Sequence, residues 1–146
     1  MSEHIILDIQ HIIDEFDEDY LIGTIKLFLE ETYPDNLNKM EDGYSTRDLK
    51  KIKIAAHTVK SSSGYLACNY FSKQCEKMEA YAKNGSWEDV DNFWKEFRTN
   101  YELLFLYAKK INDEYSKKRE DENNLSNLLD EEMNKAENEL ESNFLF

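Results

Sequence analysis

Residues that interrupt helices are scarce in this sequence, which contains four glycines and one proline among 146 residues. Strand-like alternation of apolar and polar residues is also scarce. These two shortages argue against a sheet and predict an all-α fold. A hydrophobic content of 40% at this length supports a single domain with a core of its own.

Long apolar runs are missing as well. None approaches the roughly 20 residues that a membrane-spanning helix needs, and the first residues lack the basic region and apolar core of a secretory signal. We therefore expect no membrane association and a cytoplasmic location, which would extend to the nucleus in a eukaryote. The sequence has only two cysteines, Cys68 and Cys75. On one helix they would lie about 10 Å apart, so we expect buried thiols rather than a disulfide.

Positive charge is in short supply, since 18 Lys and Arg residues face 31 Asp and Glu residues, a net charge of −13. This balance argues against a nucleic-acid partner. Four lysines nevertheless gather on one predicted helix, at positions 50, 51, 53 and 60. Such a patch either keeps the helix soluble or steers it towards an acidic partner site.

Helical spacing of apolar residues divides the chain into six expected helices. They cover residues 4–13, 17–32 and 34–42, a segment ending near residue 66, residues 70–84 and a segment that follows residue 86. The last of these helices has the clearest apolar stripe, which predicts a face buried in the core. The stripe consists of Trp87, Val90, Trp94, Phe97, Tyr101, Leu104, Ala108 and Ile111. The expected architecture is an up-down four-helix bundle over residues 1–111, with additional short amino-terminal helices.

Short polar motifs and glycines are expected to mark the ends of these helices. Ser2 would open the first helix, and Asn69 would cap the fifth. Residues 45–48 (Ser-Thr-Arg-Asp) resemble a capping box for the fourth helix, and residues 86–89 (Ser-Trp-Glu-Asp) are expected to cap the sixth. Two helices are expected to end at glycines, Gly43 and Gly85.

The fourth helix carries the most unusual residues. One of its faces is apolar or small, whereas the opposite face places His57 one turn before Lys60, near a lone Ile54. Gly64 follows on that same face, although a glycine inside a helix costs about 1 kcal/mol relative to alanine. Since the packed face does not require this glycine, its expected use is to let a large partner come close.

An exposed histidine beside a lysine suits phosphoryl transfer. A neutral imidazole nitrogen is a competent nucleophile near pH 7, because the ordinary pKa of imidazole is about 6.5. It can accept a phosphoryl group as a phosphoramidate, and Lys60 is placed to screen the phosphoryl oxygens. The plain alternative is a solvated polar histidine on a lysine-rich helix.

Residues 57–64 (His-Thr-Val-Lys-Ser-Ser-Ser-Gly) resemble the H-x-L-K-G-S-S motif of histidine-containing phosphotransfer (HPt) domains. Further matches lie where that family has a C-x-x-L-E-x-x-A-x-x-G pattern. They are Cys75, Met78, Glu79, Ala82 and Gly85. Upstream, residues 28–30 (Phe-Leu-Glu) with Pro34, and Ala56, also fit. The resemblance covers roughly residues 5–111.

The resemblance implies a free-standing phosphorelay intermediate that acts as a phosphocarrier. His57 would accept a phosphoryl group from a receiver-domain aspartate and pass it to another receiver domain, with Lys60 stabilising the phosphoryl oxygens. The implied partners are receiver domains of hybrid histidine kinases and of response regulators. Docking would involve Lys53, Ile54, Ser61 and Gly64. No cofactor or metal is expected in this chain, since Mg²⁺ would belong to the receiver, and the chain is expected to be a monomer.

Two positions depart from the family pattern, because Ser61 and Ala67 stand where glycines are usual. Ser61 keeps open an alternative function, an HPt-like helical module that docks receivers without phosphotransfer. An autonomous kinase is not expected, since a glycine-rich nucleotide loop is lacking. A metal-binding role for His4 and His11 is not expected either, because no tight ligand cluster accompanies them.

The last segment, residues 112–146, is acidic and rich in asparagine, with eleven acids and four bases. We expect it to be partly helical or disordered. Its apolar residues nevertheless recur at helical spacing, and Phe144, Leu145 and Phe146 follow them. The repeating residues are Leu125, Leu128, Leu129, Met133, Ala136 and Leu140. Packing on the bundle, docking of a partner and pairing of two chains are open alternatives.

Overall fold

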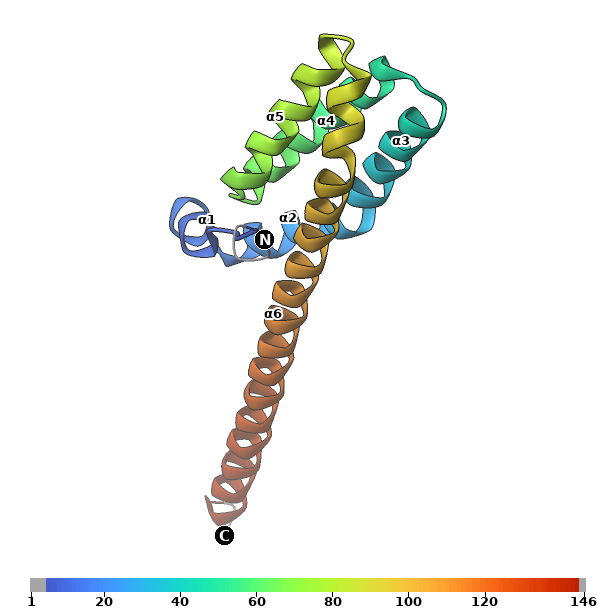
Figure 1. Ribbon diagram of the computed structural model, residues 1–146. Helices are drawn as coiled ribbons and strands as arrows, with labels where there is room; N and C mark the ends of the chain where they lie inside the picture. Colours follow the sequence, from blue (N-terminus) through green and yellow to red (C-terminus); the bar gives the residue numbers. More distant parts are fainter. Residues whose placement is uncertain (1–4, 145–146) are drawn as a thin grey trace. The chain divides into compact units, whose positions relative to one another are not determined.

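The computed structural model describes residues 5–144 and is helical almost throughout (Figure 1). Its elements in chain order are α1 (Ile9–Glu15), α2 (Glu18–Leu27), the π-helix η2 (Phe28–Thr32), α3 (Tyr33–Ser45), α4 (Leu49–Tyr65), α5 (Asn69–Lys83) and α6 (Trp87–Phe144). No strand occurs within the described residues. The predicted all-α fold is confirmed.

The contacts divide the chain into two compact units, Met1–Asn112 and Asp113–Phe146. In the first unit, α4 packs against α5 on one side and α3 on the other. The first part of α6 closes the core through aromatic contacts, since the ring of Phe71 lies 5.2 Å from that of Phe97 and 5.5 Å from that of Tyr101. Helices α3 to α6 therefore form the bundle, preceded by α1 and α2.

The predicted core face of α6 is confirmed in the first unit. Trp87 and Trp94 are half-buried, and the remaining predicted residues are buried: Val90, Phe97, Tyr101, Leu104, Ala108 and Ile111. Burial also raises the pKa of the Tyr101 hydroxyl well above its usual range. Both cysteines are buried free thiols, as predicted, and burial raises the pKa of each.

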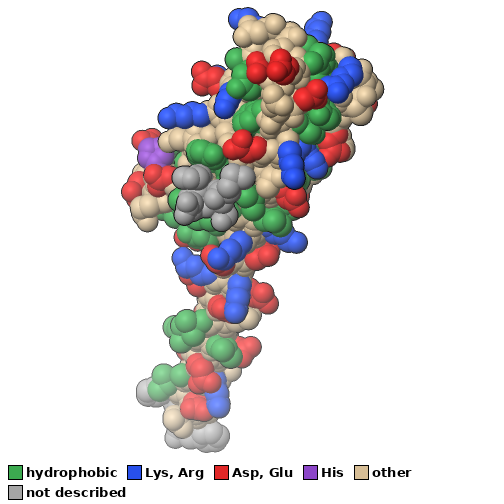
Figure 2. Space-filling model, in the orientation of Figure 1, with side chains coloured by type: hydrophobic (Ala, Val, Ile, Leu, Met, Phe, Trp, Pro, Cys, Tyr) green, Lys and Arg blue, Asp and Glu red, His purple; other side chains and the backbone are tan. Residues whose placement is uncertain are grey.

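The second unit contains the remainder of α6, and every residue from 120 to 143 is exposed. Figure 2 shows hydrophobic and acidic side chains together on this part of the surface. Across the described residues, no helix combines the length and apolar character that crossing a bilayer requires.

The predicted helix over residues 4–13 is wrong at its start. The structure begins α1 at Ile9, with Asp8 as its N-cap, whose carboxylate accepts a hydrogen bond from the His11 amide at 3.1 Å. Ile5 and Leu7 are buried on either side of the exposed Ile6, an alternation of extended chain rather than of a helix. Ser2 and His4 lie outside the described residues.

Gly43 does not end its helix, contrary to the prediction, because α3 continues to Ser45. A Cβ at this position would lie 3.0 Å from Ile52 Cγ1 and 3.2 Å from the Asp48 carbonyl oxygen. The glycine therefore lets the first turn of α4 pack closely against α3.

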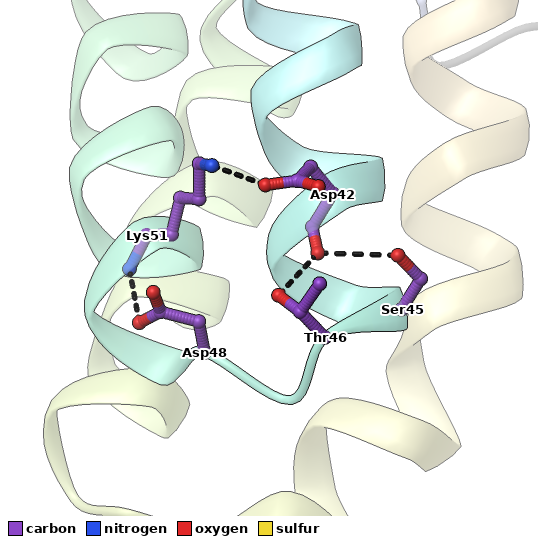
Figure 3. Close-up of polar contacts among 5 residues, drawn as sticks. All are labelled: Asp42, Ser45, Thr46, Asp48 and Lys51. Atoms are coloured by element: carbon purple, nitrogen blue, oxygen red, sulfur yellow. Dashed lines mark hydrogen bonds and ion pairs between the residues drawn. The ribbon is translucent and has the colours of Figure 1, made fainter.

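The predicted capping box at residues 45–48 is also wrong (Figure 3). Ser45 Oγ and Thr46 Oγ1 donate to the Asp42 carbonyl, at 3.2 and 2.7 Å, so they close the end of α3. Asp48 alone caps α4, accepting from the Lys51 amide at 3.2 Å, and the Lys51 ammonium pairs with Asp42. Two polar residues that looked like the start of one helix thus belong to the end of another.

The remaining helix ends are mixed in outcome. Asn69 is the first residue of α5 rather than its cap, a position held by Cys68. The cap at Ser86 is confirmed, since Ser86 Oγ accepts from the Asp89 amide at 3.3 Å and donates to Asp89 Oδ2 at 2.8 Å. Gly85 follows α5 with a φ of 74°, as a helix-ending glycine does.

Candidate functional site

Helix α4 separates the core from the candidate site. Its buried face consists of Ile52, Ala55, Ala56, Val59 and Ser63. The Ser63 hydroxyl is accommodated there because Oγ donates to the Val59 carbonyl at 2.8 Å. Because this face is buried, the opposite face of α4 points away from the core.

His57 stands on that open face, with 65% of its side chain exposed. Its Nδ1 lies 3.0 Å from Oε1 of Glu79, a residue of α5. An ionised carboxylate only accepts hydrogen bonds, so in the neutral ring this contact places the proton on Nδ1 and the lone pair on Nε2. The arrangement favours one tautomer of the neutral ring, in which Nε2 carries the lone pair.

Lys60 lies one turn beyond His57 and is half-buried. Its backbone carbonyl accepts a hydrogen bond from Ser72 Oγ of α5 at 3.3 Å, which ties this turn of α4 to the neighbouring helix. Within residues 5–144, the Lys60 ammonium forms no ion pair. It therefore remains available to an anion near His57.

The four residues predicted to dock a partner all lie exposed on α4, namely Lys53, Ile54, Ser61 and Gly64. A Cβ at Gly64 would meet no atom within 4 Å, so the protein itself does not require a glycine there. Ser61 Oγ lies 3.5 Å from the His57 carbonyl, towards its own helix. The structure brings these residues to one face with His57, and their role in docking stays a prediction.

Of the four predicted patch lysines, Lys51 is the one with an ion-pair partner, Asp42, within the described chain. A shallow hollow of about 660 Å³ lies beside α4. It is lined by Thr58, Ser62 and acidic residues of η2 and α3. His57 is not part of its lining. The imidazole thus stands on open surface, accessible to a macromolecule. Among residues 5–144, no three His, Cys, Asp or Glu side chains gather closely enough to hold a metal ion.

Sequence reasoning missed the contact of Glu79 with His57. The residue stood in the quoted family pattern, but 22 positions separate it from the histidine. A weak indication was available, because Glu79 borders the buried residues Met78 and Ala82 on α5. Which helix lies opposite this border depends on tertiary packing, which the spacing of one helix does not reveal.

The sequence is similar to known proteins. A family model described as Hpt domain matches residues 24–105. A Dictyostelium discoideum protein named phosphorelay intermediate protein rdeA is 34% identical over 77 residues, covering 53% of this chain and 29% of that protein. The match thus spans less than a third of the relative's length. No solved structure matches significantly. Because the family model covers more than half of the sequence, the chain belongs to the Hpt domain family.

Proposed function

We propose that this chain carries phosphoryl groups between receiver domains, with His57 as the phosphoacceptor. The observation that supports this best is the exposed imidazole whose Nδ1 is held by Glu79 at 3.0 Å. Family membership and a relative named as a phosphorelay intermediate support the same conclusion.

The transfer requires no proton to leave the ring. The Nε2 lone pair attacks the phosphorus of an aspartyl phosphate, the N–P bond forms, and the acyl-phosphate P–O bond breaks. The receiver's aspartate departs as a carboxylate. Because Nδ1 keeps its proton, the phosphorylated ring carries positive charge, which the Glu79 carboxylate stabilises. The reverse step delivers the group to the next receiver.

Lys60 acts on the phosphoryl group itself. Its ammonium lies one turn from the ring and stabilises the oxygens during transfer. Lys53, Ile54, Ser61 and Gly64 form part of the surface on which the receiver rests, and Gly64 leaves clearance for its backbone.

The receiver supplies the other components of the reaction. Its acidic pocket contributes the aspartate and binds Mg²⁺, so this chain needs no cofactor of its own and works as a carrier rather than an autonomous kinase. The partners are receiver domains of hybrid histidine kinases and response regulators. One copy of the chain presents the complete site, so a monomer suffices.

The test is incubation with a radiolabelled, phosphorylated receiver domain. Wild-type protein should acquire acid-labile, alkali-stable label, and His57→Gln should acquire none. His11→Gln, which alters another exposed histidine, serves as the matched control and should label normally. Label retained by the His57→Gln protein would overturn the assignment. Receiver binding by wild type without any labelling would favour the docking module that Ser61 keeps open.

Glu79 provides a sharper test of the mechanism. We expect Glu79→Ala to slow transfer by about 10- to 100-fold, because a hydrogen bond to a charged group contributes about 1.5–3 kcal/mol. Glu79→Gln can still accept from Nδ1 but lacks the charge, so it should fall between wild type and Glu79→Ala. Rapid-quench kinetics with one receiver measure this order. Equal rates for all three proteins would contradict the proposed role.

A further inference from the structure

The second unit exposes an apolar stripe that the phosphocarrier function does not use. Five large side chains of α6 in this unit are each 55–62% exposed: Leu125, Leu128, Leu129, Met133 and Leu140. Figure 2 shows hydrophobic side chains on the surface of this unit. Single exposed apolar residues are ordinary, whereas a row of them indicates an interaction surface.

The stripe is continuous because of its spacing. Leu125 and Ala136 are eleven residues apart, as are Leu129 and Leu140. Eleven residues complete just over three turns of an α-helix, so such positions return to nearly the same face. From 125 to 140 the stripe extends about 22 Å at 1.5 Å per residue, which is the length of a four-turn helical partner.

Acidic residues border the stripe on both sides. At 100° per residue, Asp130 and Glu137 lie along one edge of the row formed by residues 125, 129, 133, 136 and 140. Glu132 and Glu139 lie along its other edge, with Leu128 beyond them. Residues 120–143 contain nine acids and a single base, Lys135. The apolar face is thus bounded by two rows of negative charge, which the bound segment must match.

We propose that this face binds a basic amphipathic helix of a partner protein, with apolar residues on the stripe and lysine or arginine at both edges. A second copy of this chain is disfavoured, because its carboxylates would oppose these four. The helix also contains six asparagines between residues 120 and 143, and asparagine is a poor helix former. Packing of an apolar partner face would stabilise it.

The test uses three labelled synthetic peptides and the full-length protein. The first has leucines at the same eleven-residue spacing, flanked by lysines; the second replaces the lysines with glutamates; the third scrambles the first. Fluorescence anisotropy should show binding of the first peptide, with at least tenfold weaker binding of the other two. The double variant Leu125→Asn, Leu129→Asn should lose at least tenfold in affinity. Leu106→Asn, which changes an exposed leucine in the first unit, should bind as wild type.

Several outcomes would overturn the proposal. If the scrambled peptide bound as tightly as the first, binding would depend on charge alone and not on the apolar spacing. If the glutamate peptide bound as tightly as the first, the acidic residues would not select a basic partner. A dimer in sedimentation that the double variant dissolves would identify a second copy as the occupant. Binding to phosphatidylcholine vesicles that the same variant abolishes would identify a lipid surface. Each readout is independent of phosphotransfer, so a failure here leaves the proposed function untouched.

Discussion

The two parts of α6 share a helical spacing of apolar residues but differ in what covers them. In the first unit, Phe97, Tyr101 and Leu104 are buried against neighbouring helices. In the second unit, Leu129 and Met133 are more than half exposed. The comparison teaches that periodicity predicts a helix and an apolar face, whereas the partner of that face depends on other parts of the fold.

The largest expected difference between the two parts is in stability, and one pair of leucines measures it. Leu104→Ala should lower the free energy of unfolding by about 2–5 kcal/mol, because it removes a fully buried side chain. Leu129→Ala should change it by less than about 0.5 kcal/mol, because the side chain is exposed. Urea denaturation of both variants gives the values. Equal losses would show that the second stripe contributes to the cooperative core.

Two glycines extend the comparison to α3 and α4, because Gly43 lies on a packed helix face and Gly64 on an exposed one. Gly43→Ala should destabilise by about 1 kcal/mol, because the contacts at 3.0–3.2 Å outweigh the gain in helix propensity. Gly64→Ala should stabilise by about 0.5–1 kcal/mol, since nothing lies within 4 Å. Denaturation curves decide both signs. The second variant should also transfer phosphoryl groups more slowly, because it reduces clearance on the docking face.

The smallest expected effect concerns the carboxylate of Asp91, in the part of α6 that belongs to the bundle. Arg47 and Tyr44 donate to Asp91 at 2.8 and 2.7 Å and hold the pKa of that carboxyl below its usual range. Because the pKa of Asp91 is lower in the folded state than in the unfolded state, the ionised carboxylate stabilises the fold at any pH above the unfolded pKa of about 4. This stabilisation is lost as the pH falls through the folded-state pKa. Wild type should therefore exceed Asp91→Asn in thermal stability at pH 7, and the gap should close towards pH 2. A gap that persists at pH 2 would contradict the assignment.

Much of the fold could be predicted from the sequence, because buried faces leave a regular spacing. The apolar faces of α4 and α6 are examples. The apolar face of α4 also predicted that His57 lies on the outer side of that helix. The start of α1 could not be predicted, since Ile5, Ile6 and Leu7 fit a helix and an extended segment equally well. The hydroxyls of Ser45 and Thr46 can close one helix or open the next, and only the packed structure distinguishes these roles. The π-helix η2 was expected as ordinary helix within residues 17–32.

The candidate site was predictable only in part, for the same reason. His57, Lys60 and the docking residues belong to one helix, so their common face follows from spacing. Glu79 belongs to another helix, and its position opposite His57 requires α4 and α5 to pack in one particular register. The spacing of residues within one helix does not predict which residues of another helix they contact.

The bond between Glu79 and His57 therefore also reports on the alignment of two helices. Sliding α5 along α4 by a single turn would displace the carboxylate by about 5.4 Å and release the imidazole. Nitrogen-15 NMR of this one ring distinguishes its two tautomers. The tautomer of His57 would therefore report whether α4 and α5 are packed in the register described here.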